Sequence, residues 1–203
     1  MKNGEEITPQ IVLDEALSLA KQSSWESFSM LALAERLQCD LSVIRSFYRS
    51  KDDMAEALFD QADLAMLKLA SKLDRNNSTS TERLIDCIMA WLNFLAPHKS
   101  IIKEILAYKF EPGHFHLQAH GVTRVSRTVQ WFLQAAGRDY SGVKRVGDEL
   151  SVTSAYLLSL SFYFVDNSVQ HAKTKALLQR TLKRSSELYH VLKVISRPLR
   201  LRK

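Results

Sequence analysis

Hydrophobic residues recur along much of the chain at the three- and four-residue spacing of one face of an α-helix. The spacing is clearest in two runs, which are Ile11, Leu13, Ala16, Leu17, Leu19 and Ala20, and then Met54, Leu58, Ala62, Ala65 and Leu69. No glycine occurs between Gly4 and Gly113, and no proline occurs between Pro9 and Pro97. No long stretch of this window alternates polar and apolar residues as a strand does. The pattern predicts an all-α fold of about nine helices.

Two of the predicted helices are short and lie close together near the N-terminus. Ser29 is a suitable N-cap for a helix that ends near Gln38, and Ser42 begins a second helix that ends near Tyr48. Two short helices joined by about three residues form a helix-turn-helix, whose second helix can enter the major groove of DNA. We expect their inward-facing residues to be Leu31, Ala34, Leu37, Val43, Ile44 and Phe47.

The solvent face of the second helix would then carry Ser42, Arg45, Ser46 and Arg49. An arginine on this face can bind a guanine edge with two hydrogen bonds, and a serine can reach a phosphate. An ordinary helical hairpin with an exposed polar face would give the same pattern. Periodicity therefore leaves both interpretations open.

The segment from Ile11 to Leu58 resembles the DNA-binding domain of the tetracycline-repressor (TetR) family of bacterial regulators. The matching residues include Leu33-Ala34-Glu35-Arg36-Leu37 and the run Tyr48-Arg49-Ser50-Lys51-Asp52-Asp53-Met54, which is similar to the family's junction into its fourth helix. The resemblance implies that Ser42, Arg45 and Ser46 face the groove and that Lys51 contacts a phosphate. The chain differs from the family at Gln38, where a glycine is usual, and at Arg45, where a tyrosine is usual.

The same resemblance implies an organisation and a function. Residues 1–50 would form a helix-turn-helix DNA-binding domain, and residues 51–203 a ligand-binding and dimerisation domain. The protein would be a cytoplasmic homodimer that binds double-stranded DNA and responds to a small apolar effector, with repression as the expected mode. No cofactor is implied. An enzyme is not expected either, because the chain has no phosphate-binding glycine loop, no Gly-x-Ser-x-Gly and no dinucleotide fingerprint.

Aromatic residues are dense in the C-terminal part of the chain, where the effector would bind. The candidate lining residues of the pocket are Trp91, Tyr108, Trp131, Phe132, Tyr156 and Tyr163. Helix-bundle interiors are common ligand sites, although each of these residues could equally be part of an ordinary core. Both interpretations remain open at this stage.

The charge distribution complicates the DNA-binding hypothesis. The whole chain has a net charge of +6, yet residues 1–60 contain eleven acidic and six basic residues, a net charge of −5. Binding to phosphates favours a local excess of positive charge, so this count argues against strong DNA binding. The positive charge lies instead in residues 173–203, which contain ten basic residues and one acidic residue interleaved with leucines.

The C-terminal half offers an alternative function. The run Tyr163-Phe164-Val165-Asp166-Asn167-Ser168, followed by Thr174, Leu178 and Arg180, is similar to the end of the coenzyme Q biosynthesis lipid-binding family, which shares the TetR fold. That resemblance implies a lipid or isoprenoid carrier that associates with a membrane surface. Its basic amphipathic C-terminal segment would provide the membrane contact.

Three histidines have a spacing that resembles a metal site. His116 and His120 are four residues apart, and His114 follows a Pro-Gly turn. No cysteine lies near them and the only neighbouring carboxylate is Glu111, so a polar helix start is the favoured interpretation and no metal site is predicted.

Overall fold

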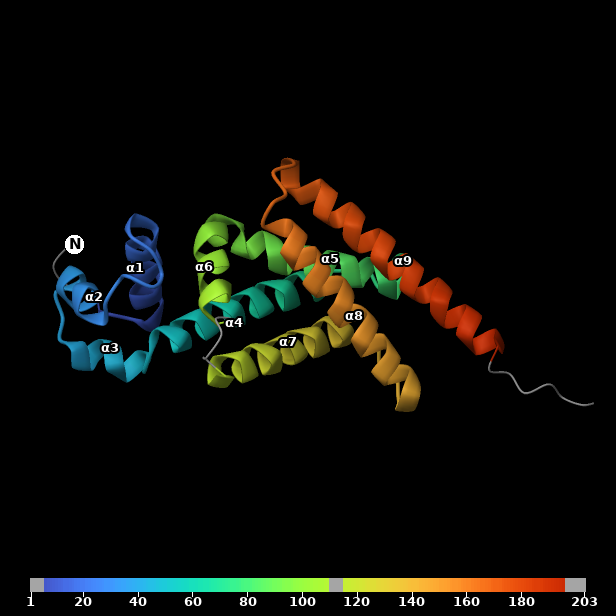
Figure 1. Ribbon diagram of the computed structural model, residues 1–203, viewed down its shortest axis with the longest axis horizontal. Coiled ribbons are helices and arrows are strands. Elements are labelled where there is room, and N and C mark those ends of the chain that lie inside the picture. Colours follow the sequence, from blue (N-terminus) through green and yellow to red (C-terminus); the bar gives the residue numbers. More distant parts are fainter. Residues whose placement is uncertain (1–5, 110–114, 196–203) are drawn as a thin grey trace, which may run out of the picture. The chain divides into compact units, whose positions relative to one another are not determined.

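The computed structural model describes the backbone of residues 6–109 and 115–195, and the side chains of residues 6–109 and 121–185. These residues form nine α-helices and two short 3-10 helices, and no strand occurs among them (Figure 1). The predicted all-α fold is confirmed. The chain divides into two compact units, one made of residues 1–65 and 94–124 and the other of residues 66–93 and 125–203.

The first unit contains the three short helices at the N-terminus. They are α1 (Pro9–Gln22), α2 (Met30–Leu37) and α3 (Leu41–Phe47), and the unit also holds the first part of α4 (Lys51–Ala70), the 3-10 helix η1 (Ala96–His98), α6 (Lys99–Lys109) and the start of α7 (Phe115–Ala135). Thr8 caps α1 by accepting a hydrogen bond from the Ile11 amide, and Pro9 occupies the first helical position. Ser29 caps α2 in the same way, by accepting from the Ala32 amide at 3.0 Å.

The turn between α2 and α3 keeps a helix-turn-helix geometry without glycine. Gln38 ends α2 in the left-handed region, with φ 53° and ψ 46°, and the next amide, that of Cys39, donates back to the Ala34 carbonyl at 3.0 Å. This is a common way for a helix to end, and glycine usually occupies the left-handed position. The backbone therefore adopts the conformation that the missing glycine would favour.

Two of the residues expected to face inward are in fact exposed. Ala34, Leu37 and Ile44 are buried as predicted, but Leu31 and Phe47 are exposed to solvent. Tyr48 takes the buried position instead, because it follows the last turn of α3 and its hydroxyl donates to the Pro9 carbonyl at 3.0 Å. The prediction was wrong by one residue at this end of α3.

The second unit is a helical bundle with an aromatic core. It contains the rest of α4 and α7, most of α5 (Ser80–Leu95), α8 (Gly142–Tyr163), the 3-10 helix η2 (Val169–His171) and α9 (Ala172–Ile195). Helix α8 packs against α9. Asp166 organises the start of α9: one carboxylate oxygen accepts from the amide and hydroxyl of Ser168, and the other accepts from those of Thr174, at 2.6–2.8 Å. None of the described helices is long and apolar enough to cross a membrane.

Candidate nucleic-acid interface

The polar residues predicted on α3 share one exposed face. Ser42, Arg45, Ser46 and Arg49 are all exposed, and we call them the α3 face. Ile44, on the same helix, is buried. Ser42, Arg45 and Arg49 also line a shallow hollow of about 370 Å³, so the side chains of both arginines border the same space. The local arrangement places two guanidinium groups where they can approach an anionic surface.

Lys51 does not point into solvent as a phosphate contact would. Its ammonium donates to the carbonyl oxygens of Trp25, Glu26 and Phe28, at 3.1, 2.7 and 3.2 Å. It also lies over the Phe28 ring, 4.8 Å from the ring centroid. An ammonium group has three N–H donors, and here three carbonyls accept from them. The observed position of the Lys51 side chain therefore does not match the phosphate contact that the resemblance implied.

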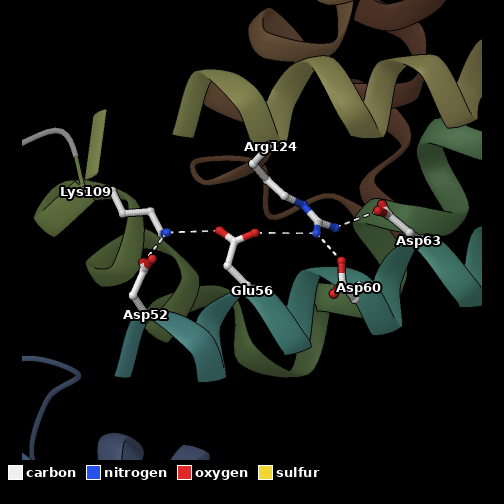
Figure 2. A network of polar contacts seen from close by, with 6 residues as sticks. All are labelled: Asp52, Glu56, Asp60, Asp63, Lys109 and Arg124. Carbon is white, nitrogen blue, oxygen red and sulfur yellow. Dashed lines mark hydrogen bonds and ion pairs between the residues drawn. The ribbon is translucent and has the colours of Figure 1, made fainter. Parts of the chain in front are cut away.

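A cluster of charged side chains lies along α4, shown in Figure 2. Asp52, Glu56, Asp60 and Asp63 form a stripe on one side of the helix, and they meet Lys109 from α6 and Arg124 from α7. We call these six residues the charged cluster.

The two cations of the charged cluster are buried and bridge several carboxylates. The Lys109 ammonium pairs with Asp52 and, at 3.1 Å, with Glu56. The Arg124 guanidinium pairs with Asp60, with Glu56 at 3.6 Å and with Asp63 at 2.6 Å. Acidic residues four apart on a helix share a face, so the stripe itself was visible in the sequence. Its partners were not, because they lie 53–64 residues further along the chain.

Three of the predicted pocket residues contact one another in the second unit. Trp91, Phe132 and Tyr156 form an edge-to-face cluster with ring centroids 5.4–6.4 Å apart, and all three are buried. Tyr163 is also buried, and its ring contacts those of Phe164 and His171.

Two other candidate pocket residues are exposed to solvent. Trp131 is exposed on α7. Tyr108 belongs to the other unit, where it is exposed and lines a separate hollow of about 290 Å³ together with Ser24, Glu26, Glu104 and Ala107. The pocket stays a prediction, for which the buried aromatic residues of the second unit are the candidates.

The histidines and most of the basic C-terminus lie beyond what the structure describes in detail. The side chains of His114, His116 and His120 are outside the described residues, as are those from position 186 onward. Among the side chains that are described, no group of three or more histidine, cysteine or carboxylate residues is arranged to hold a metal ion.

Comparison with known proteins identifies the fold. No protein-family model matches the chain, and no curated protein matches it significantly. A solved TetR transcriptional regulator from Nitrosomonas europaea is 34% identical, with a TM-score of 0.77 over 88% of this chain and 98% of that one. A TetR-family regulator from Streptomyces coelicolor is 16% identical, with a TM-score of 0.62 over 89% and 82% of the two chains.

A third solved structure has a similar fold. The regulator FadR from Bacillus subtilis, solved in complex with stearoyl-CoA, is 11% identical, with a TM-score of 0.50 over 84% of this chain and 96% of that one. At such low identity this likeness concerns the fold alone, whereas the first comparison combines substantial identity with nearly complete coverage. The resemblance seen in the sequence is thus confirmed: the chain belongs to the TetR family of transcriptional regulators.

Proposed function

We propose that the protein binds double-stranded DNA as a homodimer through the α3 face and regulates transcription, with repression as its mode. Residues 1–50 would bind DNA, and residues 51–203 would bind the effector and form the dimer. The observation that carries the proposal is that two exposed arginines line one hollow at the second helix of a helix-turn-helix, Arg45 on the helix and Arg49 just beyond its end. In this motif the second helix contacts base edges, and arginine is the side chain best suited to guanine.

The dimer is supported by an apolar stripe on α8. Val143, Val146, Leu150 and Leu157 are all exposed, although each is hydrophobic. They follow one another at intervals of three, four and seven residues, so they lie along one side of the helix. A stripe of this kind on a helix is typical of a surface that packs against a partner, and a second copy of the chain would bury both stripes at once.

An effector would act by binding one conformation of the dimer better than another. FadR, which shares the fold, is seen with an acyl-CoA. By analogy we propose a small, largely apolar effector for this protein, bound within the second unit near the buried aromatic residues. It would shift the equilibrium between conformations that bind DNA and conformations that do not, by as much as its affinities for the two differ.

The DNA-binding proposal can be tested by selecting fragments of host DNA with the purified protein at physiological salt. We expect one or a few palindromic sites to be enriched. Arg45→Ala should weaken binding to the selected site by about 1–3 kcal/mol and relax the preference for one base. Lys183→Ala, which removes an exposed positive charge on α9, is the matched control and should bind normally. Failure to enrich any site with folded protein would refute the proposal.

The dimer is tested separately by sedimentation. Leu150→Lys places a charge in the middle of the α8 stripe and should produce monomers. Leu64→Lys makes the same substitution at an equally exposed leucine on α4 and should leave the dimer intact. If the two variants sediment alike, α8 does not form the interface.

The lipid-carrier alternative gains no support from the structures compared above, which are all transcriptional regulators. The resemblance of residues 163–168 to the coenzyme Q family coincides with the Asp166 arrangement that begins α9. In this chain the arrangement orders the helix connection, and this role does not depend on a lipid.

A further inference from the structure

The first turn of α4 is bonded to three different parts of the first unit. Lys51 binds the segment between α1 and α2, as described above. Asp52 pairs with Lys109 at the end of α6, within the charged cluster (Figure 2). Asp53 accepts a hydrogen bond from the Arg49 amide at 2.8 Å, just beyond α3. Three consecutive residues therefore connect α4 to the two segments that flank the α3 face and to α6.

The segment that Lys51 binds is itself well ordered by other contacts. Trp25 and Phe28 are buried there, with rings packed edge to face at 5.3 Å. The Trp25 amide donates to the Glu104 carboxylate of α6 at 2.7 Å. The segment is thus held from one side by Lys51 and from the other by Glu104, and it leads directly into α2.

The surroundings of the Lys51 ammonium are those of a structural cation. Burial lowers its pKa, and the nearby carboxylate of Glu26 opposes that effect. The carbonyls of Trp25, Glu26 and Phe28 converge on one point, and a compact ammonium with three rotatable donors suits that geometry. A planar guanidinium, with donors spread over a fixed fork, does not suit it.

We propose that Lys51 is a positioning residue for DNA binding, which fixes the α1–α2 segment to α4 and so orients the α3 face, and that it does not contact a phosphate. The inference rests on the proposed function, because orientation of the α3 face matters only if that face binds DNA. Lys51 then acts through the position of Arg45 and Arg49. Because Lys51 neutralises no phosphate, it releases no counterion from the DNA when the protein binds.

The salt dependence of DNA binding distinguishes positioning from phosphate contact. Each phosphate contact adds about 0.9 to the slope of log K against log salt concentration. Lys51→Met should weaken binding about tenfold while leaving that slope unchanged, whereas removal of a phosphate contact lowers the slope by about 1. Arg49→Ala serves as the comparison, since its exposed guanidinium should contribute to the slope. All measurements use the full-length protein at a temperature where circular dichroism shows each variant to be folded.

Lys51→Arg provides the second variant, because it keeps the charge and loses the convergent geometry. We expect it to bind DNA as weakly as Lys51→Met. Wild-type affinity in Lys51→Arg, or a slope lowered by about 1 in Lys51→Met, would overturn the proposal.

A measurement without DNA separates this inference from the proposed function. Hydrogen exchange of the amides at residues 25–29 should accelerate in Lys51→Met, while the amides of α8 should be unaffected. If the wild-type protein enriches no DNA site, the proposed function fails and with it the role in DNA binding. Unchanged exchange at residues 25–29 would instead show that Lys51 does not hold the segment, whatever the protein binds.

Discussion

Removal of the Lys109 charge tests how much the charged cluster stabilises the first unit. The Lys109 side chain is 3% exposed, and its ammonium pairs with Asp52 and Glu56, whose side chains are 22% and 23% exposed. Lys109→Met keeps the length and apolar stem of the side chain and leaves the two carboxylates without that cation. Loss of one partner of a buried ion pair costs about 3–5 kcal/mol. Because both carboxylates still reach water, we expect about 3 kcal/mol, at the lower end.

Thermal unfolding followed by circular dichroism measures the effect. For a chain of this size, a loss of about 3 kcal/mol lowers Tm by roughly 6–12 °C. Lys175→Met is the matched control, because Lys175 pairs with Asp86 at 3.3 Å while the two side chains are 45% and 42% exposed. Exposed pairs contribute about 0.2–1 kcal/mol, so this control should lower Tm by no more than about 4 °C.

A combined variant shows whether the loss arises from charge. Adding Asp52→Asn to Lys109→Met removes the Asp52 carboxylate that paired with Lys109, while Glu56 keeps its pairing with Arg124. The combined variant should regain most of the lost stability, because replacing a whole buried pair is often neutral. The reasoning would be refuted if Lys109→Met lowered Tm no more than Lys175→Met does. It would also be refuted if the combined variant had no higher Tm than Lys109→Met alone.

Two further predictions concern single positions in the helix connections. Four hydrogen bonds from Ser168 and Thr174 outweigh the effect of burial, which acts to raise the pKa of Asp166, and hold that pKa well below its usual range. The stability that this carboxylate contributes is therefore complete above about pH 4 and falls as the pH decreases further. Asp166→Asn should lose about 2–4 kcal/mol at pH 7 and somewhat less at pH 3, where the native carboxyl is still ionised, as urea unfolding at the two pH values would show. The Gln38 side chain is exposed and its backbone lies in the left-handed region. Gln38→Gly should therefore raise the free energy of unfolding by up to about 1 kcal/mol, measured by thermal unfolding. A loss of stability would mean that the glutamine side chain makes a favourable contact.

The helices could be predicted from the sequence because the information that defines them is local. The predicted N-cap Ser29 is confirmed, and the predicted helices near 29–38 and 42–48 are observed at 30–37 and 41–47. The turn between them keeps its geometry although Gln38 replaces the usual glycine, since one residue can adopt the left-handed region at modest cost. The exposure of the α3 face also follows from helical spacing alone.

The partners of buried charges could not be predicted, because they depend on contacts far apart in the sequence. Nothing near Lys51 indicates that its ammonium binds carbonyls 23–26 residues earlier in the chain. The resemblance to the family implied a phosphate contact, which is a reasonable expectation for a lysine that follows a helix-turn-helix. Similarly, a pocket was inferred from aromatic density, yet Tyr108 and Trp131 lie on exposed helix surfaces.

The structure changes how the acidic composition of the N-terminal region should be weighed. Three of its eleven acidic residues, Asp52, Glu56 and Asp60, are engaged with cations from α6 and α7, which lie outside the first sixty residues. Two others serve local contacts, since Glu15 pairs with Arg36 and Asp53 accepts from the Arg49 amide.

Part of the net charge of −5 is therefore offset by cations that lie outside the first sixty residues. Arg45 and Arg49 remain exposed, and the α3 face itself contains no acidic residue. With so few cations on that face, the salt dependence of binding should be shallower than that of proteins with an extensively basic surface. Specificity would then depend mainly on how accurately the two arginines are placed, which gives the bonds of the first turn of α4 their importance.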